Sequence, residues 1–389
     1  MKGHALALAL ALLSGCHRRG RHRAPGPSDP RLRLATACED PRYVMAPPRA
    51  TRFLGPLPAV DRPALAGSAG RVLVAAAHAA GAVAWVEGEA QPAALEPGPV
   101  LGDLAAVGLP AGAQARFVVA WTRAPGTELR WLDARGAVRA QVTLPRERAP
   151  SMAYTSGALA VATLVGGEDL PTVRLRLFDA RGRAVRDAVA LGPAGVGRAV
   201  AVTAAGARFA LVWSGTVLRP GLLRFATVDL GGGASAVTDV LEERGAVGRV
   251  ALAYGGGRVA LVWTDTRSGV PEVYSTAVDL EGRCPPGVQQ LSVRAELGAR
   301  PSVVWDGGAF GAAWSEPLGP DRWRSYVALL DTGGLRIGTQ VRLWEPDEAV
   351  SLKTPSLVFT GRGYALASAR GDGAVELRHT GPRLCDQRP

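Results

Sequence analysis

Histidine and cysteine are scarce in this sequence, and their positions exclude the common metal centres. Of five histidines in 389 residues, only His78 and His379 lie beyond the first 34 residues. No His-Glu-x-x-His motif occurs, which excludes a zincin, and the four cysteines lack the spacing of a zinc site. We therefore expect neither a metal nor another cofactor.

The usual motifs of nucleophilic and phosphate chemistry are also missing. The sequence contains no Gly-x-Ser-x-Gly elbow, no phosphate-binding Gly-Lys-Ser/Thr loop and no Gly-x-Gly-x-x-Gly segment behind a strand. Calcium loops of the Asp-x-Asp-x-Asp-Gly type and the Ser-x-Asp-x-Gly-x-Thr-Trp boxes of sialidases are absent too. The sequence thus predicts no catalytic residue and favours a protein that is not an enzyme.

Lysine is nearly absent, and much of the positive charge lies at the N-terminus. Arginine outnumbers lysine 43 to 2, which we interpret as a consequence of genome composition. Residues 1–34 contribute +6 of the formal net charge of +11, so the rest of the chain carries only a small net charge. No basic run interleaved with aromatic residues follows, and we expect no nucleic-acid partner.

The apolar run at the N-terminus is too short to span a bilayer. Ala5–Leu13 has nine residues and the proportions of a signal-peptide core, whereas a transmembrane helix needs about 20. Leu13-Ser14-Gly15-Cys16 follows and resembles the lipobox of bacterial lipoproteins. The resemblance implies that residues 1–15 are a signal peptide and that Cys16 carries the acyl chains of a durable membrane anchor. An ordinary secretory signal is the alternative.

Residues 16–37 are basic, polar and rich in proline and glycine, which predicts a disordered tether. His17, and not aspartate, follows Cys16. By the sorting rule of bacterial lipoproteins, the resemblance implies the outer membrane of a Gram-negative cell. The membrane is therefore one expected partner, reached through the lipid anchor.

The sequence does contain a repeat of about 40–50 residues. Its clearest copy, Arg258–Gly282, has an apolar strand ending at Trp263, a polar connection, a second strand and a turn that begins at Asp279. Positions equivalent to Trp263 recur at 76, 121, 163, 213, 314 and 368. One further strand precedes each of these positions, and another follows the turn. This spacing predicts an all-β fold over residues 38–389, a seven-bladed β-propeller with four-stranded antiparallel blades.

Three residue types recur at equivalent positions of the units. An aspartate begins each Asp-x-x-Gly turn, and we interpret its side chain as a structural cap of the turn. These residues are Asp133, Asp179, Asp229, Asp279 and Asp331. Tryptophans end the apolar strands, where we expect core packing of Trp121, Trp213, Trp263 and Trp314. Arginines occupy the following loops and form a candidate anion-binding rim of Arg123, Arg219, Arg267 and Arg322. Ordinary surface arginine in an arginine-rich chain is the alternative for this last set.

One unit resembles a known repeat. Trp263-Thr-Asp265-Thr-Arg267-Ser-Gly269 is similar to the Trp-x-Asp-x-Arg-x-Gly repeat of secreted bacterial β-propellers. That resemblance implies the fold and not the activity, because members of the group differ in function. We expect a lipid-anchored, non-enzymatic binding or scaffold protein of the cell envelope, with a protein or glycan partner. The alternative is a hydrolase or lyase of envelope polysaccharide on the same scaffold.

The last unit lacks a fourth strand. We expect part of the N-terminal segment, around Thr51–Leu54, to add to it as the outer strand and to close the ring. Closure would bring Cys38 near Cys385, so these two are the candidates for a disulfide, with Cys284 as a competing partner.

The lipobox can be tested directly. We expect Cys16→Ser to abolish acylation and to release the protein into the periplasm, because the thiol is the attachment point. Cys284→Ser is the matched control and should remain in the detergent phase. Detergent-phase partitioning and acyl labelling measure both variants, and continued labelling of Cys16→Ser would contradict the assignment.

Overall fold

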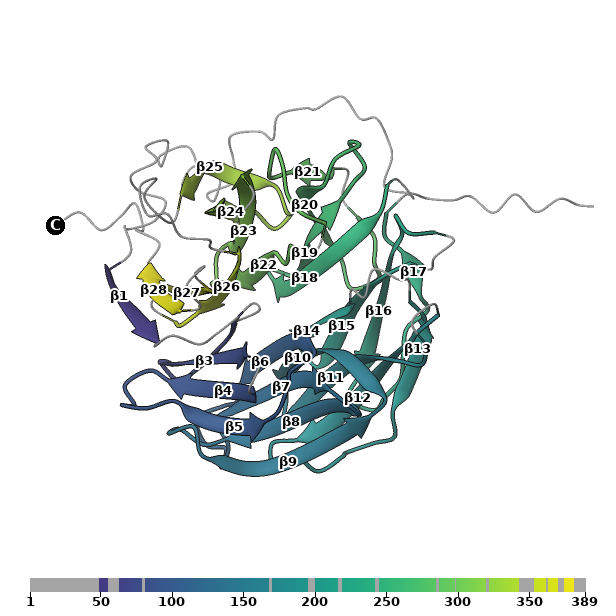
Figure 1. Cartoon of the computed structure of the whole chain (residues 1–389). Helices are drawn as coiled ribbons and strands as arrows, with labels where there is room; N and C mark the ends of the chain where they lie inside the picture. The colour runs from purple at the N-terminus through teal and green to yellow at the C-terminus, as the bar shows by residue number, and fades with distance from the viewer. Residues whose placement is uncertain are drawn as a thin grey trace, which may run out of the picture.

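Seven four-stranded antiparallel sheets surround a central axis in the computed structural model (Figure 1). The structure describes residues 49–54 and 63–380, except for 79–80, 168–169, 195–199, 216–218, 242–244, 285–286, 298, 320–321, 343–352, 362 and 370–373. All regular elements in these ranges are strands, which confirms the predicted seven-bladed β-propeller. No helix that could cross a membrane occurs in them.

The first four blades each use four consecutive strands, counted outward from the axis. Blade 1 comprises β2 (Ala64–Ser68), β3 (Arg71–His78), β4 (Gly81–Val86) and β5 (Ala93–Pro97). Blade 2 comprises β6 (Gly102–Gly108), β7 (Phe117–Arg123), β8 (Gly126–Leu132) and β9 (Val138–Pro145). Blade 3 comprises β10 (Glu147–Thr155), β11 (Ala158–Val165), β12 (Thr172–Asp179) and β13 (Val189–Pro193). Blade 4 comprises β14 (Val200–Ala205), β15 (Arg208–Ser214), β16 (Leu223–Asp229) and β17 (Thr238–Asp239).

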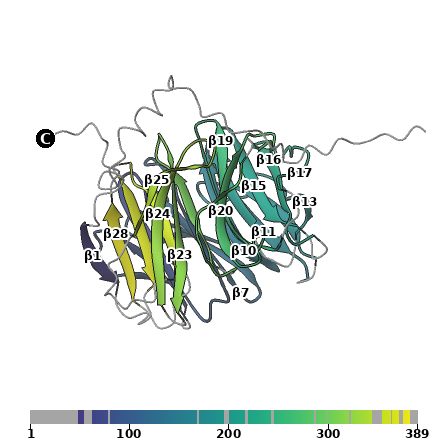
Figure 2. The same ribbon diagram turned by 90° about the horizontal axis from the view of Figure 1, so that it is seen from above.

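The remaining blades repeat the pattern, and only the seventh departs from chain order. Blade 5 comprises β18 (Val247–Gly255), β19 (Arg258–Asp265), β20 (Glu272–Val278) and β21 (Gln289–Gln290). Blade 6 comprises β22 (Ser302–Trp305), β23 (Phe310–Gly319), β24 (Arg322–Leu330) and β25 (Arg336–Arg342). Blade 7 comprises β26 (Lys353–Phe359), β27 (Tyr364–Ala369), β28 (Val375–Thr380) and β1 (Arg49–Leu54). Figure 2 shows the same ring from another side, with strands of successive blades side by side.

The second strand of each blade is buried on both faces, which explains its unbroken apolar sequence. We call these the anchor strands. In β19, Val259, Leu261 and Trp263 pack against blade 4. Ala260 and Val262 point the other way and pack against blade 6. Because side chains alternate along a strand, the anchor strand presents its larger residues to one neighbour and its smaller ones to the other.

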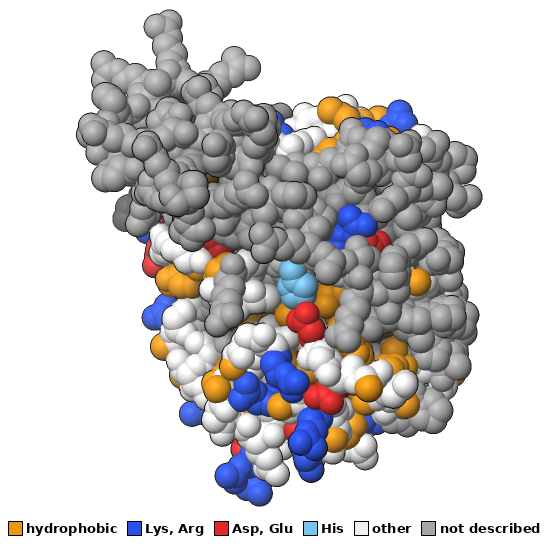
Figure 3. Space-filling view, turned by 90° about the vertical axis from the view of Figure 1, so that its left-hand side faces the viewer, with side chains coloured by type: hydrophobic (Ala, Val, Ile, Leu, Met, Phe, Trp, Pro, Cys, Tyr) orange, Lys and Arg blue, Asp and Glu red, His pale blue; other side chains and the backbone are white. Residues whose placement is uncertain are grey.

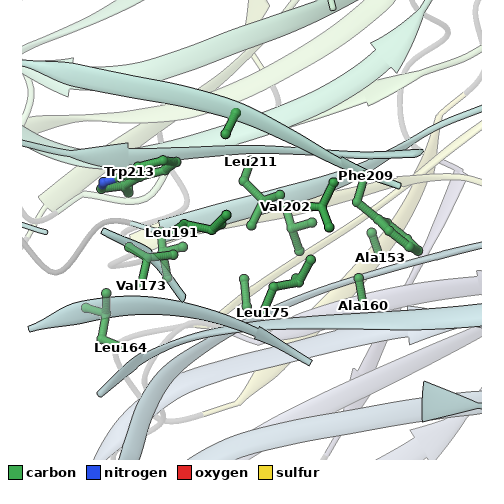
Figure 4. Close-up of a cluster of buried hydrophobic side chains, with 14 of the residues drawn as sticks. Ala153, Ala160, Leu164, Val173, Leu175, Leu191, Val202, Phe209, Leu211 and Trp213 are labelled. Carbon is green, nitrogen blue, oxygen red and sulfur yellow. The ribbon is translucent and has the colours of Figure 1, made fainter. Parts of the chain in front are cut away.

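The hydrophobic core consists of seven clusters, one between each pair of neighbouring blades. Figure 4 shows the interface of blades 3 and 4, where Phe209, Leu211 and Trp213 of β15 face Ala160 and Leu175. Complete burial of one such aliphatic or aromatic side chain contributes about 1.5–3 kcal/mol. A single blade leaves both of its apolar faces uncovered, so the blades are stable only as a ring.

The Asp-x-x-Gly turns connect the third and fourth strands of five blades, and their predicted role as caps is confirmed. In each turn the aspartate Oδ1 accepts the N–H four residues later, at 2.8–3.0 Å: Asp133, Asp179, Asp229, Asp279 and Asp331. The turn glycines have φ of 78–87°. At Gly334, a Cβ atom would also lie 2.3 Å from the backbone of Thr276, so only glycine fits.

Strand β1 lies antiparallel to β28 as the outermost strand of blade 7. The register pairs Phe53 with Glu376 and Leu54 with Val375. The sequence places a strand at this position, around Thr51–Leu54. That this pairing is what holds the ring closed stays a prediction.

The predicted disulfide and lipid anchor involve residues outside the described ranges. This applies to the signal peptide at 1–15, the tether at 16–37, and to Cys16, Cys38 and Cys385. The described part of the chain contains no disulfide. In it, the Sγ atom of Cys284 lies 3.3 Å from the carbonyl oxygen of Val240.

The contribution of β1 can be measured by truncation. A chain that begins at Gly55 loses the strand and exposes the edge of β28, whereas a chain that begins at Arg49 keeps it. We expect the shorter chain to lose at least about 2 kcal/mol of stability, which lowers Tm by roughly 4 °C or more. Equal Tm values for the two chains would show that β1 does not hold the ring closed.

Candidate binding site at the channel mouth

The innermost strands of the seven blades line a cavity of about 240 Å³ on the central axis. Its walls come from the first half or the middle of these strands, as with Ala64 and Leu65 of β2 or Ser356 and Leu357 of β26. We call this end of the blades the upper end. Because anchor strands are antiparallel to the innermost ones, the loops that follow them lie at the upper end as well, as the pairing of Val247 with Asp265 shows.

Three charged side chains line this cavity and meet across it: Asp103 of blade 2, Arg249 of blade 5, and Arg300, which precedes blade 6. Nη1 of Arg249 lies 3.1 Å from Oδ1 of Asp103, and Nη2 of Arg300 donates a hydrogen bond to the same oxygen. The side chains are 17%, 24% and 14% exposed, respectively. The two guanidinium groups and the carboxylate thus form one cluster. We call it the mouth cluster.

The backbone places these side chains by local irregularities at the start of the innermost strands. Asp103 is the extra residue of a β-bulge in β6, with a φ of 51° after Gly102 with a φ of 126°. Arg249 lies in the corresponding bulge of β18. A bulge turns a side chain away from its regular direction in the sheet. Arg300 stands two residues before β22, at the corresponding place of blade 6.

The mouth cluster suits recognition of an anion better than acid–base chemistry. Guanidinium groups bind carboxylates and phosphates through paired hydrogen bonds. Glycoside hydrolysis needs two carboxyl groups on either side of the bond to be cleaved. Among the described residues that line the cavity, Asp103 is the only carboxylate, and none is a histidine or a cysteine. No group of metal-binding side chains occurs in the described ranges.

Two arginines of the predicted rim lie near acidic residues of their own blades. Nη1 of Arg219 lies 3.4 Å from Asp239 of the same blade. Nε of Arg123 lies 4.0 Å from Glu128, again within one blade. Arg322 begins β24, and its side chain is not described. The anion-binding role of this rim stays a prediction, and the arginines that meet in the cavity are two others.

Arg267, the fourth rim residue, belongs to a buried cluster inside blade 5. Its Nε lies 2.8 Å from Oδ2 of the fully buried Asp265, which also accepts the indole N–H of Trp263 at 3.1 Å. The guanidinium group lies over the rings of Trp263 and Tyr274, at 5.3 and 4.9 Å from their centroids. The side chains of Trp263, Asp265 and Arg267 therefore contact one another inside the blade, an arrangement that we call a clamp. The predicted core position of Trp263 is confirmed.

Tyr274 completes this clamp from the neighbouring strand. Its ring stacks on Trp263 with a centroid distance of 6.0 Å, and its hydroxyl donates a 2.5 Å hydrogen bond to Glu272. Burial, together with that hydrogen bond, raises the pKa of Tyr274 to about 12. The phenol thus remains a neutral donor far above neutral pH.

Similar contacts between the anchor tryptophan and charged side chains occur in blades 2 and 6. In blade 2, Arg130 lies over Trp121 and pairs with Glu128 at 2.9 Å. In blade 6, the indole N–H of Trp314 donates to Glu316 at 3.2 Å, and burial raises the pKa of that carboxyl. Trp121, Trp213 and Trp314 are at most 1% exposed, which confirms that these tryptophans are core residues. The buried carboxylates therefore serve the packing of the blades.

The mouth cluster was not predicted from the sequence, although the repeat contains one indication of it. Arg249 precedes Trp263 by the same number of residues as Arg300 precedes Trp314, so both arginines occupy one position of the repeat. Asp103 has no such signal, because its contact with Arg300 joins residues 197 positions apart. Only the assembled ring brings the three together.

Comparisons with known proteins find only distant structural similarity. No protein-family model matches the chain, and no curated protein matches it in sequence. Among solved structures, a Penicillium chrysogenum α-L-arabinanase complexed with arabinobiose has a TM-score of 0.48 and 11% identity, over 86% of this chain and 98% of that one. The Aleuria aurantia lectin in complex with Fucα1-6GlcNAc has a TM-score of 0.46 and 13% identity, over 77% and 100% of the two chains. A chain of the mitotic checkpoint complex has a TM-score of 0.49 and 12% identity, over 85% and 94%. Such distant similarity carries no information about a ligand or an activity of this chain.

The clamp of blade 5 can be tested by truncating its aromatic ring. We expect Trp263→Ala to lower the free energy of unfolding by about 3–5 kcal/mol, because it opens a cavity between blades 4 and 5. Arg283→Ala, in an exposed turn of the same blade, is the matched control and should change stability by less than about 1 kcal/mol. Urea unfolding measures both, and wild-type stability of Trp263→Ala would reverse the assignment to the core.

Proposed function

We propose that this chain is a non-enzymatic binding or scaffold protein of the cell envelope that receives its partner at the upper end of the propeller. The observation that carries the proposal is the mouth cluster, in which Asp103, the single carboxylate among the described residues of the cavity wall, is held between two guanidinium groups. Such a carboxylate has no second acid to work with, so binding is favoured over hydrolysis. The lipobox at Leu13–Cys16 supports attachment to the membrane, with the outer membrane as the proposed site.

The distribution of exposed apolar side chains supports a protein partner. Nine large hydrophobic side chains are exposed in the described part of the chain, and five of them lie at the upper end: Leu101, Leu170, Val270, Val293 and Leu318. The most exposed three, at 64–77%, are all in this group. Exposed aliphatic side chains at one end of the propeller suit contact with a protein. A glycan surface would instead favour exposed aromatic rings, and the exposed group contains only leucine and valine.

The described part of the face in Figure 3, on one side of the propeller, offers less to a partner. Over the described part of the face in Figure 3, basic and acidic side chains are interspersed with apolar atoms, without a broad field of one sign. A surface with interspersed charges of both signs stays soluble, but its electric field attracts no particular partner strongly. The upper end is therefore the better candidate for specific recognition.

Site-specific photo-cross-linking in intact cells tests this function. A photoreactive residue in place of Leu101, 66% exposed at the upper end of blade 2, should form an adduct with a protein. The matched control replaces Val138, 41% exposed at the opposite end of the same blade, and should form none. Absence of adducts at both positions, together with release of reducing sugar ends that depends on Asp103, would favour the polysaccharide hydrolase instead.

A further inference from the structure

We infer that Arg249 and Arg300 form a carboxylate-binding site in the channel mouth and that Asp103 occupies this site as an internal substitute for the ligand. The inference deepens the proposed function and rests on it only for the source of the carboxylate. The site itself follows from the contacts of the cluster and the space around it.

The contacts show what kind of group the two arginines hold. Guanidinium groups from two different blades approach one and the same oxygen of Asp103, which reaches them from the opposite side of the ring. A carboxylate is thus the group that this pair of arginines already fits. A ligand that presents a carboxylate to them would replace the side chain of Asp103 with a chemically identical group.

The cavity provides room for such a ligand. Its volume of about 240 Å³ exceeds the roughly 150 Å³ of an engineered cavity that holds benzene. The other described residues of the wall are uncharged, and several are small, such as Ala105, Ser151 and Ala201. The space therefore accepts the end of an aspartate or glutamate side chain, or a free carboxylic acid of similar size.

Exchange of the Asp103 carboxylate for an external one keeps a carboxylate opposite the two guanidinium groups. When an external carboxylate displaces Asp103, the aspartate can turn toward solvent, because its side chain is partly exposed. Asp103 then acts as a tethered competitor that lowers the affinity for external carboxylates.

The positive φ of Asp103 agrees with this role. Its φ of 51° lies in the left-handed region, where aspartate and asparagine are tolerated better than most residues. Asp103→Asn keeps this backbone and removes the charge, so it tests the competition without a change of shape. Arg249→Gln and Arg300→Gln remove one guanidinium group each, and a loss of folding in one leaves the other informative.

The experiment follows the thermal unfolding of the full chain with Cys16→Ser, titrated with sodium acetate at constant ionic strength. We expect a saturable rise of Tm in the parent protein and an apparent Kd roughly tenfold lower in Asp103→Asn, because the tethered competitor is gone. Arg249→Gln and Arg300→Gln should lose the saturable rise. Arg283→Gln, with a 73% exposed side chain in a third-to-fourth strand turn, is the control and should retain it.

Titrations with two further ligands identify the source of the carboxylate and separate this inference from the proposed function. A short capped peptide with one glutamate that binds more tightly than acetate would indicate a protein side chain, whereas tighter binding of free succinate would indicate a small acid; either outcome supports the site. If Asp103→Asn does not tighten acetate binding, or if the arginine variants respond like the parent, the inference is wrong and the cluster is only a contact across the channel. Cross-linking at position 101 can succeed or fail independently of this result.

Discussion

The fold depends on one constraint: no blade can cover its own two apolar faces. The anchor strands send alternate side chains toward the two neighbouring blades, and each of the seven core clusters is shared by two blades. A missing or displaced blade would therefore expose two such surfaces at once. This mutual dependence makes the ring the unit of stability, and the Asp-x-x-Gly turns add to it where they approach the preceding blade.

The same constraint separates the charges of the protein into two groups. Charges at the level of the anchor tryptophans, such as Asp265 with Arg267, are buried and paired within one blade, where an unpaired partner would be costly. The charges of the mouth cluster come from three blades and remain partly exposed. They lie outside the packed interfaces, so the identity of these side chains is free to follow function.

The sequence predicted the parts of this arrangement that repeat. The spacing of the anchor positions, the capped turns and the core position of Trp263 follow from local pattern, because a strand or a turn uses residues that are close in sequence. The rim of four arginines was proposed on the same grounds, yet the pattern did not show that Asp265 holds Arg267 from two residues away. The mouth cluster could not be predicted as a unit, because Asp103 meets Arg249 and Arg300 only after blades 2, 5 and 6 have closed around one axis.

The central claim is that the mouth cluster exists for a ligand and not for the fold. The most direct measurement is the free energy of unfolding of the triple variant with Asp103→Asn, Arg249→Gln and Arg300→Gln, in the absence of added carboxylate. Since partly exposed ion pairs contribute little and the variant removes the charges of all three side chains together, we expect stability within about 1 kcal/mol of the wild type. A loss of about 3 kcal/mol or more, comparable to that of opening a core cavity, would show that the cluster holds the ring together and would contradict the account.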